Sequence, residues 1–116
     1  MTAISKDLVA ATSIPVILAI LKQGESYGYE IIQKVKEASK GQLQFSDGTL
    51  YPILRKLEDK EFIISEWRIA ENEKRRRYYS ITSKGNDYFK DEHAAWDAMY
   101  QLINELWNLQ PKLYTL

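Results

Sequence analysis

Residues 46–58, with the sequence SDGTLYPILRKLE, decide the fold of this chain. Ser46 and Asp47 are residue types that cap helices, and apolar side chains recur after them at helical spacing. Pro52 fits such a helix only near its first turn, where its missing N–H costs no hydrogen bond, so the helix should begin within 47–49. The face opposite the apolar stripe is mostly polar and offers Thr49, Tyr51, Pro52, Arg55 and Lys56.

Two helices are predicted upstream of this one. Residues 7–22 carry apolar side chains at three- and four-residue steps, and Pro15 should kink that helix unless it starts afresh at Ser13. A second helix should have Ser26 as its N-cap and should end at residues 40–41.

A β-hairpin is predicted downstream. Residues 63–69 and 77–82 are rich in β-forming side chains, and the polar residues 70–74 should link them. Two or three helices followed by a short hairpin with a cationic arm are typical of a winged helix-turn-helix. The cationic arm consists of Lys74, Arg75, Arg76 and Arg77.

One long helix over residues 83–109 should end the chain. Its apolar residues cover more than one stripe, and the remaining domain is too small to bury them all, so part of this band should face a partner helix. The expected fold is therefore mainly α with a small β-hairpin. Residues 1–82 should form the winged helix-turn-helix DNA-binding domain, whose first helix also joins the dimer interface, and residues 83–116 the C-terminal dimerisation helix.

Composition excludes several classes of protein. A chain of 116 residues with 45% hydrophobic and 28% charged residues is typical of one ordinary globular domain. The absence of cysteine excludes disulfides and thiolate metal sites and is typical of a cytoplasmic protein. No apolar run is long enough to span a membrane. His93 is the sole histidine, so neither a metal cluster nor a histidine-centred catalytic site is expected. We expect a protein that is no enzyme and needs no cofactor.

The charge is unevenly distributed, although it sums to zero. Four successive cations stand at 74–77, whereas residues 83–110 carry two cations and five anions. A basic middle and an acidic tail favour nucleic acid as the partner of the middle segment. Alternatively, the basic run is a solvated hairpin face.

Three ordered motifs resemble the PadR family of transcription regulators: 27-YGYE-30, 48-GTLYPILRKLE-58, and 76-RRYYSIT-82 followed by Lys84-Gly85. The resemblance implies a repressor with a winged-helix head, whose first and last helices exchange contacts with a second subunit. The short last helix suggests the smaller branch of the family. Glu61 stands where a glycine commonly ends the recognition helix, and the wing tip 70–73 lacks the usual glycines and carries two acids.

The DNA-binding residues are expected on the 46–58 helix, the start of the second helix and the basic arm. Thr49 and Tyr51 suit phosphates or thymine methyls, Arg55 suits guanine or phosphate, and the arm suits phosphates. Alternatively, Tyr51 is half-buried, and Tyr27 and Tyr29 only pack against the head. The 46–58 helix could also be an ordinary core helix. In a winged-helix module without DNA binding, it would dock on another protein. The full set is Tyr27, Tyr29, Asp47, Gly48, Thr49, Tyr51, Pro52, Arg55, Lys56, Lys74, Arg75, Arg76 and Arg77.

The aromatic residues of the last helix have two interpretations. They could pack a dimer core, or they could line a pocket for a planar aromatic effector at the dimer axis. Small members of the resembled family are similar in placing a tryptophan of the last helix at this axis. Asp97 would favour a cationic compound. The candidate effector residues are Leu8, Ala11, Pro15, His93, Trp96, Asp97 and Tyr100.

Overall fold

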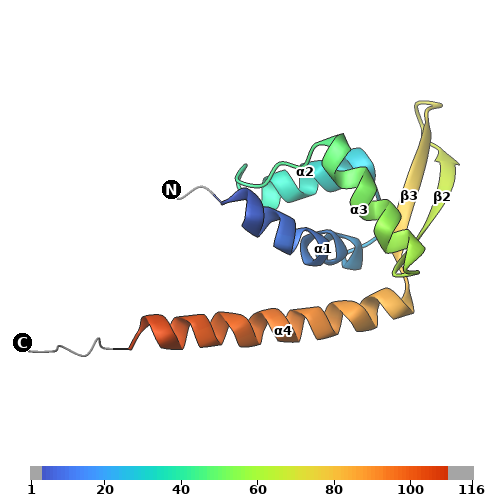
Figure 1. The fold of residues 1–116 in the computed structure, drawn as a ribbon. Coiled ribbons are helices and arrows are strands. Elements are labelled where there is room, and N and C mark those ends of the chain that lie inside the picture. Colours follow the sequence, from blue (N-terminus) through green and yellow to red (C-terminus); the bar gives the residue numbers. More distant parts are fainter. Residues whose placement is uncertain (1–3, 110–116) are drawn as a thin grey trace, which may run out of the picture.

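The computed structural model describes residues 4–109, so the ends of both expected segments, residues 1–3 and 110–116, lie outside the described residues. Three helices and a small sheet form a head, and one long helix runs beside it (Figure 1). In chain order the elements are α1 Lys6–Lys22, β1 Ser26–Tyr27, α2 Gly28–Ala38, α3 Asp47–Asp59, β2 Ile63–Ile69, β3 Arg75–Ile81 and α4 Ser83–Trp107.

Helix α3 begins where its sequence predicts. The Ser46 hydroxyl accepts a hydrogen bond from the Thr49 backbone N–H at 3.2 Å, and Pro52 stands in the helix near this capped end. Leu50, Leu54 and Leu57 point into the core and are fully buried, so the opposite face of α3 is left to solvent.

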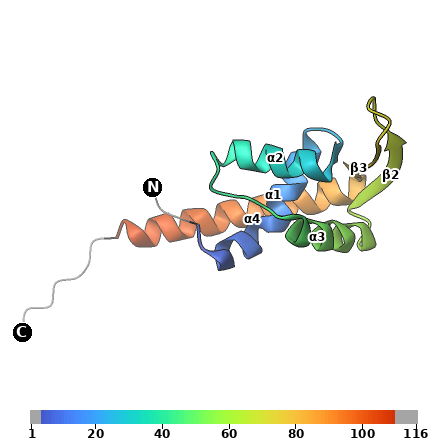
Figure 2. The same cartoon turned by 90° about the horizontal axis from the view of Figure 1, so that it is seen from above.

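Helix α1 is a single element that includes Pro15, so the alternative of a fresh start at Ser13 was wrong. Its N-cap is Ser5, whose hydroxyl accepts from the Leu8 N–H at 3.2 Å. Helix α1 lies between the other head helices and α4 (Figure 1), and seen from above it crosses α4 (Figure 2). Because it is covered from both sides, Ile17 and Leu18 are fully buried at the centre of the core.

The prediction that Ser26 caps the second helix was wrong. Ser26 and Tyr27 form β1, which pairs antiparallel with β3 through the partners Tyr79 and Tyr78, so α2 begins two residues later than the proposed cap. The buried Ser26 hydroxyl donates to the Glu30 carboxylate at 2.7 Å instead of accepting from a helix N–H. Backbone pairing with a distant strand outweighs the local capping preference.

The predicted hairpin is part of a three-stranded sheet in the order β1-β3-β2. β3 starts at Arg75, two residues before the predicted start, so most of the cationic run lies within a strand and not in the link. Ile63 pairs with Ile81, and Ser65 with Tyr79. The buried Ile63 and Tyr79 mark the sheet face that packs on the helices.

Helix α4 is joined to the head at its first turns. A Cβ on Gly85 would lie 2.9 Å from the Ile81 side chain and closer still to the Phe62 carbonyl, so only glycine fits there. Tyr88 stacks on Phe62 with ring centroids 4.3 Å apart. Beyond these turns the helix leaves the head and ends at Trp107, two residues before its predicted end. No helix within residues 4–109 is long and apolar enough to cross a membrane.

Candidate nucleic-acid interface

The polar face of α3 is exposed over its whole length. The three buried leucines turn this face away from the core, as the helical period predicts. Among the described residues, the predicted DNA-contacting side chains of α3 and its cap region that are exposed are Asp47, Thr49, Tyr51, Pro52, Arg55 and Lys56, together with Gly48.

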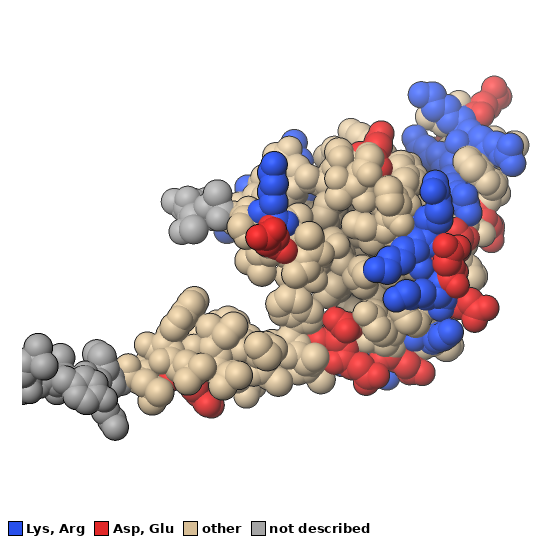
Figure 3. Space-filling model, viewed as in Figure 1, with Lys and Arg blue, Asp and Glu red and all other residues tan. Residues whose placement is uncertain are grey.

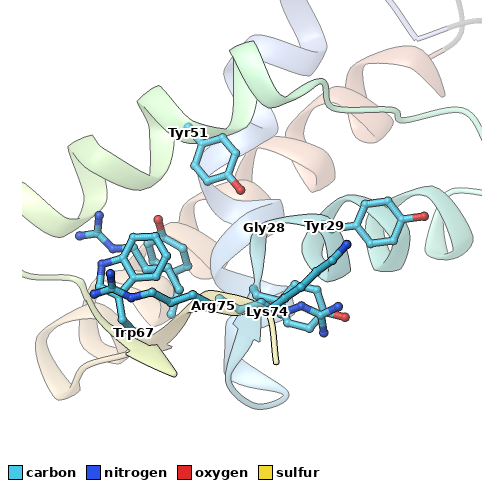
Figure 4. Close-up of a pocket in the computed structure, with 10 residues that line it drawn as sticks. Gly28, Tyr29, Tyr51, Trp67, Lys74 and Arg75 are labelled. Carbon is cyan, nitrogen blue, oxygen red and sulfur yellow. The ribbon is translucent and has the colours of Figure 1, made fainter. Parts of the chain in front are cut away.

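Tyr51 leans from α3 onto the start of α2. A Cβ on Gly28 would lie 2.9 Å from Cζ of the Tyr51 ring, so the Tyr51 side chain can take this position only because residue 28 is glycine. Tyr51 as a whole residue is 42% exposed. Tyr51 is therefore partly exposed and packs against the head, with its hydroxyl end directed toward Gly28 (Figure 4).

Strand pleating divides the cationic run between two faces of the wing, as β2, β3 and their link are called here. Arg75 and Arg77 lie on the face of Tyr79, which is turned toward α3, and Arg76 lies on the opposite face. The Arg75 guanidinium carbon is 4.8 Å from the Trp67 ring centroid, and that of Arg76 is 4.4 Å from the Tyr27 ring centroid. Two of the arginines thus rest on different aromatic rings.

Arg77 is paired with two side chains of the same chain. Its Nη2 lies 2.9 Å from Oε1 of Glu58 on α3, and its Nε donates to the Ser65 hydroxyl at 2.8 Å. The charge of Arg77 is therefore partly neutralised, and the pair ties the wing to α3. Sequence reasoning missed Glu58, because the two charges stand 19 residues apart and nothing local links them.

A concavity of about 530 Å³ lies where α2, α3 and the wing meet. Figure 4 shows Tyr51 above it, Lys74 extending toward Tyr29, and Arg75 running back toward Trp67. Of the predicted DNA-binding residues, the concavity gathers Tyr27, Tyr29, Tyr51, Lys74, Arg75, Arg76 and Arg77. It adds Gly28, Trp67 and Tyr79, which the sequence did not single out for DNA.

A second hollow continues this surface along α3. It brings Arg55 together with Tyr51 and Arg77, so the recognition face of α3 and the wing form one contiguous surface. Thr49 lines a separate cleft beside α1. The remaining predicted residues, Asp47, Gly48, Pro52 and Lys56, line neither hollow, although they are exposed on the same helix.

Positive side chains gather over the wing and the adjoining end of α3, with acids between them (Figure 3). On the far face of the wing, Arg68 pairs with Glu25 and, at 2.7 Å, with Glu66. The hydrogen bond from Arg68 lowers the pKa of the Glu25 carboxyl. Burial raises the pKa of the Tyr79 hydroxyl, which stays neutral. Among residues 4–109, Arg55 on α3 and Arg75 on the wing face turned toward α3 form no ion pair with an acidic side chain. A surface with such cations can bind phosphates and reach base edges.

The candidate effector residues are only partly brought together in one chain. Trp96 lines a shallow apolar hollow of about 240 Å³ with Ala95, Met99 and Ile103. His93 Nδ1 lies 3.6 Å from an Asp97 carboxylate oxygen on the exposed surface of α4. The other predicted residues, Leu8, Ala11, Pro15 and Tyr100, do not line this hollow. Residues 4–109 hold no group of three or more side chains suited to bind a metal ion.

Known proteins resemble this chain over most of its length. Residues 17–91 match the model of the Transcriptional regulator PadR-like family. A protein of Lysinibacillus sphaericus, called Uncharacterized protein X, is 28% identical over 101 residues, which are 87% of this chain and 93% of that protein. The Transcriptional regulator YqjI of Escherichia coli is 30% identical over 88 residues, 76% of this chain but 41% of its own length.

Solved structures share the fold. A transcriptional regulator from Clostridium thermocellum superimposes with a TM-score of 0.79 and 32% identity, covering 86% of this chain and 97% of that one. A PadR-like transcriptional regulator from Bacillus cereus superimposes with a TM-score of 0.79 and 25% identity, covering 90% of this chain and 100% of its own. The winged-helix fold expected from the sequence is thereby confirmed.

Proposed function

The chain belongs to the Transcriptional regulator PadR-like family. We propose that it is a repressor that binds a palindromic operator as a homodimer and is released by a small aromatic effector or by a stress signal. The family makes it a DNA-binding transcription regulator and not an enzyme. The repressor role, the dimer, the operator and the effector are our proposals, as is a cytoplasmic site of action.

One observation carries the proposal for DNA. The exposed polar face of α3 is contiguous with the concavity beneath the wing, so a single surface presents Arg55, Tyr51 and the open wing cations together. A helix laid in the major groove would direct Arg55 at base edges. Thr49, at the capped end of α3 beside a separate cleft, would meet a phosphate or a thymine methyl. The wing would contact the backbone of the same half-site. Tyr29, which is 65% exposed at the start of α2, would offer its hydroxyl to a further phosphate.

The dimer proposal rests on the apolar surface of α4. Past the head, this helix exposes Trp96 at 37%, Ile103 at 40% and Trp107 at 81%, and Leu8 of α1 is 47% exposed. This half of the helix is almost free of charge in the view of Figure 3. Monomeric proteins rarely leave such a continuous apolar surface in water. Isologous pairing through α1 and α4 would cover it and would suit a palindromic operator.

The effector proposal places a flat molecule between the two Trp96 rings of the dimer. Leu8, Ala11 and Pro15 of the partner's α1 would form the far wall, and His93, Asp97 and Tyr100 would flank it. Such a ligand would release DNA if it favours one spacing of the recognition helices over another. Trp fluorescence should change on titration with a planar cationic dye in the native protein and much less in Trp96→Ala. Equal affinity in both proteins would leave Trp96 as a packing residue.

A mobility shift with the promoter upstream of the protein's own gene tests the DNA proposal. We expect retention of that duplex against excess unrelated duplex, and a footprint with two symmetric half-sites. Failure to retain any duplex even at low salt would favour the second candidate, a winged-helix module that docks on protein. The polar face of α3 speaks against that candidate, because a protein-docking helix would expose apolar side chains.

A further inference from the structure

A tryptophan lies between two arginines on the wing face that is turned toward α3. Strand pairing sets Trp67 directly opposite Arg77 and Ile69 opposite Arg75, so Trp67 and Arg75 are diagonal neighbours on that face. The guanidinium carbons of Arg75 and Arg77 lie 4.8 Å and 5.9 Å from the centroid of the Trp67 ring. Both arginines are therefore within cation–π distance of one ring.

The two arginines differ in their other contacts. Arg77 is held by Glu58 and by the Ser65 hydroxyl, which makes it part of the scaffold. Within residues 4–109, Arg75 forms no ion pair with an acidic side chain. Its positive charge is thus open to a ligand, while its guanidinium carbon lies over the Trp67 ring.

Trp67 is a large aromatic residue that is exposed on the wing. Trp67 is 54% exposed at the rim of the concavity that also contains Tyr51, Lys74 and Arg75. Burying a core is therefore not its main contribution. A flexible arginine loses rotamer freedom when it binds a phosphate, and a ring that already restrains the guanidinium reduces that cost.

We propose that Trp67 is a positioning residue for DNA binding, whose ring holds Arg75 at the rim of the concavity so that its guanidinium meets a backbone phosphate. This inference rests on the proposed function. Arg77, anchored to Glu58, fixes the strand position opposite the ring. The four cations of the run are then unequal: Arg75 binds the phosphate, whereas Arg77 supports the structure that presents it.

Fluorescence anisotropy with a labelled promoter duplex tests this role in the full chain. Trp67→Leu should raise Kd about threefold to tenfold, whereas Trp67→Phe should stay within about twofold because the ring face is kept. In an Arg75→Ala background the same Trp67→Leu change should alter Kd by less than about twofold, since the group that it positions is gone. Ile64→Ala, on the outer face of the same strand and 60% exposed, is the matched control and should leave Kd unchanged.

Two results would overturn the inference. If Trp67→Leu weakens binding as much in the Arg75→Ala background as in the native protein, Trp67 acts on DNA or on wing folding by itself. Melting temperatures of all variants separate these two explanations. If the native protein binds no duplex, the proposed function fails as well, whereas native binding with an uncoupled Trp67 rejects only the positioning role.

Discussion

The phenol ring of Tyr51 occupies the space that a side chain at Gly28 would need. A Cβ at residue 28 would lie 2.9 Å from the ring carbon Cζ, closer than carbon atoms approach without strain. The Tyr51 side chain of α3 therefore packs against the start of α2 in the space left by the absent side chain of Gly28. This contact sets where the Tyr51 hydroxyl lies on the proposed DNA surface.

Gly28→Ala should displace Tyr51 without unfolding the head. Alanine suits a helix better than glycine does, and the atom in its way belongs to the end of a movable side chain, so we expect the unfolding free energy to change by less than about 1 kcal/mol. DNA affinity should fall about tenfold or less, which is about 1.4 kcal/mol. Anisotropy titrations in a Tyr51→Ala background provide the control: an undiminished loss there would show that Tyr51 does not mediate the effect.

Glu58→Gln should loosen the wing from α3. The Arg77–Glu58 pair is 41% and 30% exposed at its side chains, so solvent screening limits its contribution to about 0.5–1 kcal/mol. We expect a small drop in melting temperature by calorimetry. Arg77→Ala should lower the melting temperature at least as much, because the hydrogen bond to Ser65 is lost too, and the double variant should be no less stable than Arg77→Ala alone. Additive losses would contradict the assignment of Arg77 to this pair.

Arg55→Ala and Arg76→Ala should weaken DNA binding in different ways. If Arg55 reads a guanine, its loss should cost about 1–3 kcal/mol and relax the preference at one position per half-site. Arg76 should contact phosphate, so its loss should weaken all sequences alike and reduce the salt slope by about one unit. Selection from a randomised duplex pool, followed by salt titration, measures both. An unchanged preference and an unchanged slope would mean that the interface lies elsewhere.

Glu61→Gly should stabilise the protein. Glu61, two residues past the end of α3, has a φ of 65°, a left-handed conformation that costs a non-glycine residue roughly 1–2 kcal/mol. Its carboxylate lies 3.7 Å from Lys84 Nζ on an exposed surface, so little is lost with it. We expect a higher denaturation midpoint in urea. Glu61→Ala, which keeps the steric cost, serves as the control and should not raise the midpoint.

Ile103→Glu should convert a dimer into a folded monomer. Ile103 is 40% exposed in the single chain, so a charge there disturbs little of the head but would be buried in an α4 interface. Gln101→Glu adds the same charge at an exposed position about 200° away around the helix and should leave the dimer intact. Light scattering at tens of micromolar gives the masses, and a monomeric native protein would reject the dimer.

Much of the head follows from local sequence signals. Ser46 caps α3, the leucine spacing divides that helix into a buried and an exposed face, and β-forming residues mark β2 and β3. These features were predictable because caps, helical period and strand propensity act between residues only a few positions apart. Which of the exposed residues contact DNA remains a prediction.

Three features depended on residues that are distant in the chain. β1 exists because Ser26 and Tyr27 pair with β3, Arg77 is neutralised because Glu58 reaches it from α3, and Gly28 is needed because Tyr51 leans on it. No local pattern encodes these contacts, because each requires the strand register and the helix packing to be in place first. The sequence by itself determined the helices, their faces and the basic run. Only the tertiary structure decided which cations are open to a ligand. The pleat of β3 places the arginines of the basic run on two faces, and Glu58 pairs with Arg77.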